Sequence, residues 1–216
     1  MIVLGLTGSI GMGKTTAAAA FRRLGVPVFD ADREVRRVLA RHGAAVAPVA
    51  AAFPGMVNAG AVDRARLAKL VFDDDAARQK LESIVHPLVR AEERRFLTRA
   101  RLERRKIAVL DIPLLFETGA EGLCDASIVV TAPPFIQERR VLCRPGMTKA
   151  LFARILASQM PDIEKRKRAD FTVPTGLGQR TTLKALRRIV RLMRKNCHAA
   201  RRAALSERYA RNRPRY

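Results

Sequence analysis

Short apolar runs alternate with longer helical patterns along the chain. Ile2–Leu6 is apolar without polar alternation, as expected of a strand covered on both faces. Four further runs predict strands, the last more weakly: Val26–Asp30, Lys106–Leu110, Ala126–Thr131 and Phe171–Pro174. Helix-like segments separate the runs, so the pattern predicts an α/β fold with a five-stranded, mainly parallel sheet. Right-handed crossovers bring the carboxyl ends of the strands to one edge, where such sheets bind ligands.

Two long intervals interrupt this βαβ pattern. Residues 33–105 exceed one crossover helix and contain several helical patterns, which predicts a mostly helical inserted domain. Residues 133–168 form a second excursion, rich in arginine, that we interpret as a lid. The nucleotide-binding core then comprises residues 1–32, 106–132 and 169–195. Beyond residue 195 the helical periodicity of apolar residues ends, and the basic tail 196–216 is expected to be poorly ordered.

The first predicted strand leads into a phosphate-binding motif. Residues 8–15 read GSIGMGKT, which matches G-x-x-x-x-G-K-[ST], and a strong helix composition follows. Glycines allow a tight turn whose N–H groups point inward, and the dipole of the following helix favours an anion. Lys14 can reach the β- and γ-phosphates, and the Thr15 hydroxyl can bind Mg²⁺. A Gly-rich turn without a ligand is the weaker interpretation, because the motif lies between a strand and a helix.

The motif predicts that the chain binds ATP and Mg²⁺. The P-loop residues expected to bind ATP are Gly8, Gly11, Met12, Gly13, Lys14, Thr15 and Thr16.

Carboxylates follow two of the other predicted strands. Asp111 comes directly after KIAVL and resembles the acid that holds Mg²⁺ in P-loop enzymes, although acids often end strands. Asp30 and Asp32 close the second strand, where a carboxylate could orient an acceptor hydroxyl and take its proton. The alternative is that Asp32 caps the helix predicted for REVRRVL. The residues alone leave both roles of Asp32 open, and they nominate Thr15 and Asp111 as metal ligands.

The arginines of 133–168 suit a lid, because phosphoryl transfer is catalysed largely by positive charge that closes around the transferring group. Some of them are expected to belong to a solvated helix face. Arg140 and Arg144 are four residues apart and are expected to face the same way. We therefore favour these two as the lid arginines that act on the nucleotide, with Arg144 expected to bind ATP.

Charge and composition indicate which kinds of ligand the chain could bind. The formal net charge is +22, and Arg180–Tyr216 holds 13 Lys and Arg against one acid. A positive body suits nucleotides, and the tail could contact nucleic acid, although a solvated basic surface is equally consistent. Aromatic residues make up 5% and Trp is absent, which disfavours a single-strand stacking platform.

Three dispersed cysteines support neither a disulfide framework nor a zinc site, and the Cys197-His198 pair lacks further clustered ligands. No stretch approaches the ~20 apolar residues of a membrane span. These features predict a cytoplasmic protein that does not associate with a membrane.

The motifs in this order resemble those of the dephospho-coenzyme A kinase family. The resemblance runs from Ile2 to about Gly178, short of the basic tail. The quoted segments are GLTGSIGMGKT, LGVPVFDAD, VDRARLAKLVF, LESIVHPLV, VLDIPLLFE, QERRVLCR, RILASQM and KRADF. Many families share the P-loop, whereas DAD, HP and PLLFE in this order are specific.

The resemblance implies a nucleotide-binding core, a helical coenzyme A domain and a lid. It implies transfer of phosphate from ATP to the ribose 3′-hydroxyl of dephospho-coenzyme A, with Asp32 as general base and Lys14 and Arg140 stabilising charge. The substrate-binding residues that it implies are Asp32, Arg64, His86, Pro87, Leu115, Phe116 and Glu117. From the residues alone, His86 at a break between helical patterns is more typical of a structural histidine.

The chain departs from the family pattern after the fifth predicted strand. The family commonly has a polar turn with Asn or Asp there, and this chain has Pro174-Thr175-Gly176. We expect this turn beside the adenine, which leaves nucleotide selectivity open.

A monomer or weak homo-oligomer is expected. The alternatives are another small-molecule or nucleoside monophosphate kinase, and a nucleic-acid-binding ATPase. No RNA-recognition, KH, zinc-finger or clear helix-turn-helix signature favours the latter.

Overall fold

The computed structural model describes residues 1–195, without the side chains of Phe72 and Asp73. This part of the chain forms two compact units. The first comprises Met1–Phe29 and the chain from Ala100 onward, and the second comprises Asp30–Arg99. The predicted lid segment, 133–168, belongs to the first unit, and the predicted basic tail lies outside the described residues.

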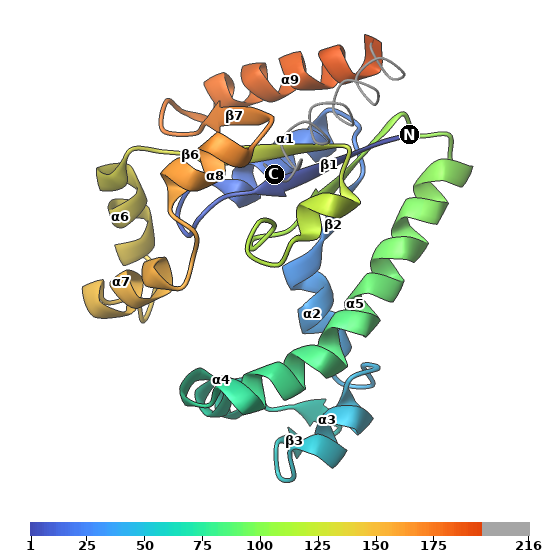
Figure 1. The fold of residues 1–216 in the computed structure, drawn as a ribbon, viewed down its shortest axis with the longest axis vertical. Coiled ribbons are helices and arrows are strands. Elements are labelled where there is room, and N and C mark those ends of the chain that lie inside the picture. Colours follow the sequence, from blue (N-terminus) through green and yellow to red (C-terminus); the bar gives the residue numbers. More distant parts are fainter. Residues whose placement is uncertain (196–216) are drawn as a thin grey trace, which may run out of the picture. The chain divides into compact units, whose positions relative to one another are not determined.

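The first unit is built on a five-stranded sheet in the order β2-β5-β1-β6-β7. Its strands are β1 (Ile2–Thr7), β2 (Val28–Asp30), β5 (Ile107–Asp111), β6 (Ala126–Thr131) and β7 (Phe171–Pro174). The pairs β1–β5, β1–β6 and β6–β7 are parallel (Figure 1). The predicted α/β fold with five strands is therefore confirmed, although β2 begins two residues later than expected.

Strand β1 is the central strand of the sheet, and both of its faces are covered. Ile2, Leu4 and Leu6 belong to the core cluster that also contains residues of α1 (Lys14–Arg23) and α9 (Gln179–Lys195). Gly5 faces the other way, and a Cβ atom there would lie 2.8 Å from Leu115 Cδ2. The unbroken apolar run in the sequence thus reflects burial on both sides of the sheet.

The remaining helical elements of the first unit follow β5 and β6. They are the 3₁₀ turn η1 (Ala120–Leu123), α6 (Pro134–Leu142), α7 (Lys149–Ala157) and α8 (Asp162–Arg168). Within residues 1–195, no helix has the length and apolar character needed to cross a bilayer.

The second unit is mostly helical. It contains α2 (Ala31–Leu39), α3 (Val46–Ala52), α4 (Arg64–Asp73) and most of α5 (Asp75–Leu102). The hairpin β3 (Val57–Asn58) and β4 (Ala61–Val62) was not predicted, because two-residue strands are too short to show an alternation. Its loop residues Ala59 and Gly60 both have positive φ, as a tight hairpin turn requires.

The predicted helix break at His86-Pro87 is wrong, because both residues lie inside the 28-residue helix α5. Pro87 removes one backbone donor from the helix. Buried Val85 and Val89 flank the proline, and the Asp74 carboxylate accepts hydrogen bonds from the N–H groups of the first turn. Packing and capping therefore carry the helix through a proline that local propensity disfavours.

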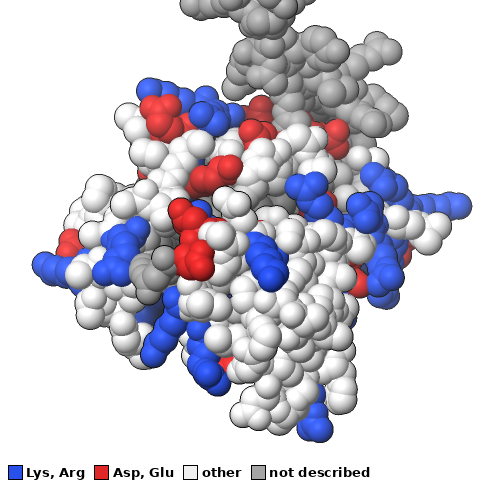
Figure 2. Space-filling model, turned by 60° about the horizontal axis from the view of Figure 1, so that its bottom comes forward, with Lys and Arg blue, Asp and Glu red and all other residues white. Residues whose placement is uncertain are grey.

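On the face shown in Figure 2, positive charge does not gather in a single patch. The face shown in Figure 2 carries separate groups of Lys and Arg with Asp and Glu between them. Helix α9 is basic along its exposed side. The predicted contact of the tail with nucleic acid, and the Cys197-His198 pair, lie outside the described residues.

Candidate active site

The loop between β1 and α1 has the backbone that the phosphate-binding motif requires. Gly11 and Gly13 have φ values of 78° and 86°, in the left-handed region that favours glycine. A Cβ atom would lie 2.6 Å from Val141 Cγ2 at Gly11 and 2.9 Å from Thr175 Oγ1 at Gly13. Gly13 is also the N-cap of α1 and offers no side-chain acceptor, so the first N–H groups of α1 remain available to an anion.

Lys14 and Asp111 meet at this loop although 97 positions separate them in the chain. Lys14 Nζ lies 2.7 Å from Asp111 Oδ1, and the Asp111 side chain is only 3% exposed. The β1–β5 register explains the meeting, because it pairs Asp111 with Leu6, two residues before the loop. The hydroxyl-bearing residues Thr15 and Thr16 are exposed at the start of α1.

The outer side of the loop is held by side chains that the sequence did not identify. The Ile10 carbonyl accepts from Gln137 Nε2 at 2.7 Å, and the Ile10 N–H donates to Gln159 Oε1 at 3.1 Å. Gln137 lies on α6, and Gln159 follows α7. Both glutamines stand inside segments quoted above, QERRVLCR and RILASQM, but a motif does not say what a single side chain contacts, so only the fold reveals these bonds.

Arg140 and Arg144 do not share a helix face, and that prediction is wrong. Arg140 lies on α6, and its Nη2 donates to the Thr175 carbonyl at 2.8 Å. Helix α6 ends at Leu142, so Arg144 lies beyond it as an exposed residue. The reason is local, because the residue that precedes Pro145 is disfavoured in helical conformation.

Asp30, not Asp32, caps helix α2. The Asp30 Oδ1 atom accepts the Arg33 N–H at 2.8 Å. Asp32 lies in the first turn with an exposed side chain. The capping alternative therefore applies to Asp30 and leaves the Asp32 carboxylate accessible for other chemistry.

The other substrate candidates of the second unit are also exposed. Arg64 begins α4, and His86 and Pro87 lie on α5. Because His86 is exposed, it is not the buried structural histidine of the alternative interpretation. Among the interactions of the described residues, no hydrogen bond or ion pair joins Asp32, Arg64 and His86.

Part of the PLLFE segment packs inside the first unit. Leu115 is 0% and Phe116 6% exposed, so both are core residues in this structure. Glu117 Oε1 lies 2.7 Å from Lys165 Nζ and accepts the Met160 N–H at 2.9 Å. The substrate-binding roles expected of these three residues stay predictions. Lys165, in the predicted lid segment, is fully buried.

The environment of Glu117 lowers the pKa of its carboxyl group. Burial acts to raise this pKa, but hydrogen bonds from Lys165 and from the Met160 N–H outweigh burial and stabilise the anion. A folded-state pKa below the unfolded one contributes stability above the unfolded value. That contribution is lost as the pH falls through the folded pKa.

We expect Lys165→Met to destabilise the protein by about 3 kcal/mol, because it leaves the Glu117 carboxylate without its buried cation. The matched control is Lys167→Met on the same helix, which removes an exposed pair with Glu164 and should cost at most about 0.5 kcal/mol. Denaturant unfolding of both variants measures the difference. Equal costs would contradict a stabilising role of the buried pair.

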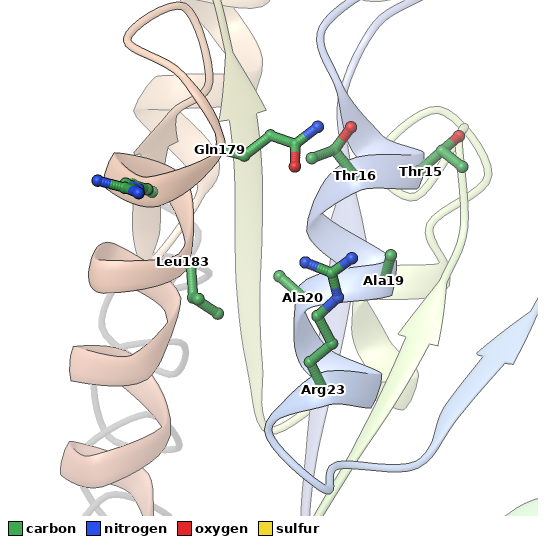
Figure 3. A pocket seen from close by; sticks show the side chains of 8 residues that line it. Thr15, Thr16, Ala19, Ala20, Arg23, Gln179 and Leu183 are labelled. Carbon is green, nitrogen blue, oxygen red and sulfur yellow. The ribbon is translucent and has the colours of Figure 1, made fainter.

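A groove of about 310 Å³ lies between α1 and α9. Its lining residues are Thr15, Thr16, Ala19, Ala20, Arg23, Gln179, Arg180 and Leu183. Figure 3 shows the Gln179 side chain directed toward Thr16, and Arg23 reaching along α1 toward Ala19 and Ala20. The groove therefore begins at the P-loop threonines and continues over a mainly apolar floor with polar groups around it.

Comparisons with known proteins agree with this geometry. The sequence model of the family described as dephospho-CoA kinase matches residues 2–176. The dephospho-CoA kinase of Paramagnetospirillum magneticum is 60% identical over 200 residues, covering 93% of this chain and 94% of that protein. The dephospho-CoA kinase of Mesorhizobium japonicum is 57% identical over 178 residues, covering 82% and 89%.

Solved structures agree on the fold. The structure of TT1252 from Thermus thermophilus aligns with a TM-score of 0.75 at 38% identity, covering 88% of this chain and 95% of that one. Dephospho-CoA kinase from Campylobacter jejuni aligns with a TM-score of 0.61 at 22% identity, covering 88% and 96%, and supports the fold alone. With a P-loop, a Lys14–Asp111 pair and relatives of this similarity, the chain belongs to the dephospho-CoA kinase family and is an ATP-dependent phosphotransferase.

Proposed function

We propose that the chain transfers the γ-phosphoryl group of ATP to the ribose 3′-hydroxyl of dephospho-coenzyme A, giving coenzyme A and ADP. The observation that carries the proposal is the 2.7 Å contact of Lys14 with Asp111 beside a glycine loop of this family. Phosphoryl transfer depends mainly on positioning and on charge stabilisation, which these groups can provide.

Lys14 would bind the β- and γ-phosphates, and the P-loop amides would hold the remaining phosphate oxygens. Arg140 would add positive charge close to the transferring group, because its permanently charged guanidinium lies beside the loop, on the Gly11 and Thr175 carbonyls. Arg144, exposed beyond α6, would bind the nucleotide from the lid segment. The groove beginning at Thr15 and Thr16 offers room for the nucleoside part of ATP.

Thr15 and Asp111 would hold Mg²⁺, and their chemistry fits this ion. A hydroxyl and a carboxylate are hard oxygen ligands, and Mg²⁺ usually takes one or two protein carboxylates and completes its shell with water and phosphate. Consistent with such a sparse site, residues 1–195 contain no cluster of three or more His, Cys, Asp or Glu side chains suited to a metal. The ion would neutralise charge on the β- and γ-phosphates.

Asp32 would act as general base toward the acceptor hydroxyl. Its carboxylate is exposed, and the capping of α2 is already provided by Asp30. A positioned base of this kind orients the hydroxyl and takes its proton as the phosphoryl group is transferred. Arg64, His86 and Pro87 would bind dephospho-coenzyme A, whose phosphates suit a guanidinium.

An acceptor survey coupled to ADP release tests the reaction and the substrate together. We expect turnover with dephospho-coenzyme A and MgATP, and at least about 100-fold lower kcat/KM with nucleoside monophosphates, because a site built for specific polar contacts discriminates strongly. Turnover with a monophosphate and none with dephospho-coenzyme A would favour the nucleoside monophosphate kinase alternative. A cytoplasmic location and a monomeric or weakly associating state remain predictions.

A further inference from the structure

Thr175 lies where the chain departs from its family pattern, and its side chain is turned into the protein. The residue follows β7 directly and is only 4% exposed. Its N–H donates to the Thr131 carbonyl at 2.8 Å, which extends the β6–β7 ladder by one residue. A threonine in this position is therefore held rigidly at the end of the sheet, beside the glycine loop.

The Thr175 hydroxyl forms a cross-link to that loop. Its Oγ1 atom donates to the Met12 carbonyl at 2.7 Å, and it accepts from Arg140 Nη1 at 3.1 Å. A hydroxyl has one proton to donate, so the shorter contact to Met12 takes it rather than the 3.2 Å contact to the Thr131 carbonyl. A Cβ atom on Gly13 would lie only 2.9 Å from Oγ1, so the hydroxyl packs directly against the loop.

This bond determines the direction of an amide that faces the phosphate site. The Met12 carbonyl and the Gly13 N–H belong to one planar trans peptide, so they point in opposite directions. Because Thr175 holds the Met12 carbonyl on its own side of the peptide, we expect the Gly13 N–H to point to the opposite side, where a phosphate would bind. A loop whose donors are already oriented binds a phosphate without further reorganisation.

We infer that Thr175 is a positioning residue for the triphosphate: its hydroxyl fixes the Met12–Gly13 peptide and thereby orients the Gly13 amide toward the β-phosphate. This inference rests on the proposed function of the loop as the ATP phosphate site. It concerns the Thr175 hydroxyl alone, and the place of the turn 174–176 beside the adenine stays a prediction. Arg140 takes part in the same arrangement, because it contacts the hydroxyl and the Thr175 carbonyl and also lies 3.4 Å from the Gly11 carbonyl.

The test compares ligands that differ in the β-phosphate. Thr175→Val keeps the shape of the side chain and removes the hydroxyl, and Thr175→Ser keeps the hydroxyl. Titration calorimetry of the full chain with ADP and with AMP should show that T175V weakens ADP binding about tenfold and AMP binding less than twofold. T175S should bind both ligands within about twofold of the unmodified protein, because the donor to Met12 remains.

A second readout follows the amide itself. In nuclear magnetic resonance spectra of the nucleotide-free protein, the Gly13 amide signal should shift or exchange faster in T175V and stay near its original state in T175S. If T175V does not fold, Thr175→Ala removes the same hydroxyl and replaces it in both measurements.

The outcomes separate this inference from the proposed function. Equal losses for AMP and ADP in T175V would place Thr175 on the nucleoside side and overturn the inference, as would unchanged ADP binding. If the unmodified protein binds neither ADP nor MgATP, the proposed function fails, whatever the variants do. A lower melting temperature with unchanged ADP binding would reveal a purely structural role and would also overturn the inference.

Discussion

Asp32→Asn should lower kcat for transfer to dephospho-coenzyme A by about 10²–10⁴-fold while ATP affinity changes by no more than about threefold. The amide keeps the size of the side chain but cannot take the proton of the acceptor hydroxyl. The structure removes the competing explanation, since helix capping depends on Asp30. A loss in D32N would therefore reflect chemistry rather than an unwound first turn of α2.

Glu34→Gln is the matched control, because it removes one acidic charge from the same helix without changing the shape of the side chain. Glu34 pairs with Arg37 across one turn, and the side chains are 14% and 59% exposed, so loss of this surface pair should lower stability only modestly. Steady-state kinetics with dephospho-coenzyme A and calorimetry with MgATP distinguish the two variants. Full activity of D32N, or equal losses in both, would exclude Asp32 as the base.

Lys14→Ala is the second variant with a large expected effect, on both binding and rate. Loss of a preorganised charge at the transferring phosphate should lower kcat about 10³-fold, and the Kd of MgATP should rise at least about tenfold. Titration calorimetry measures the Kd of MgATP, and single-turnover kinetics measure the rate of phosphoryl transfer, so the two effects are separated. An unchanged Kd together with normal turnover would contradict the assignment of the phosphate site to this loop.

Lys14→Arg separates catalysis from folding. The guanidinium retains a cation for the Asp111 carboxylate, which is nearly buried, so the melting temperature should stay closer to that of the unmodified protein than in the alanine variant. Its planar fork does not reproduce the point charge of an ammonium at the phosphates, so activity should not recover. Recovery of activity in K14R would show that only charge, and not geometry, matters at this position.

Sequence reasoning succeeded where a physical requirement is local. The run Ile2–Leu6 had to be a buried strand, because an unalternating apolar segment cannot face water on either side. The loop 8–15 had to be rich in glycine, because Gly11 and Gly13 adopt backbone conformations that other residues rarely accept. These two features together predicted a P-loop fold, and the fold was confirmed.

Local patterns misled wherever tertiary packing decided the outcome. Burial of Val85 and Val89 carries α5 through Pro87. The end of α6 before Arg144 has instead a local cause, Pro145, which the four-residue spacing of Arg140 and Arg144 does not show. In the PLLFE segment the sequence alone does not show which side chains are buried. Leu114 is exposed, Leu115 is fully buried, and Glu117 is paired with a lysine 48 positions away.

By itself the sequence determined the strands, the glycine loop and the set of candidate charges, because backbone propensity and hydrophobic periodicity act over a few neighbouring residues. The tertiary structure alone decided which of those groups meet. Parallel register brings Asp111 to Lys14, and the end of β7 brings Thr175 to Met12 across 163 positions. Such meetings depend on crossovers and on packing between distant segments, which no local pattern encodes.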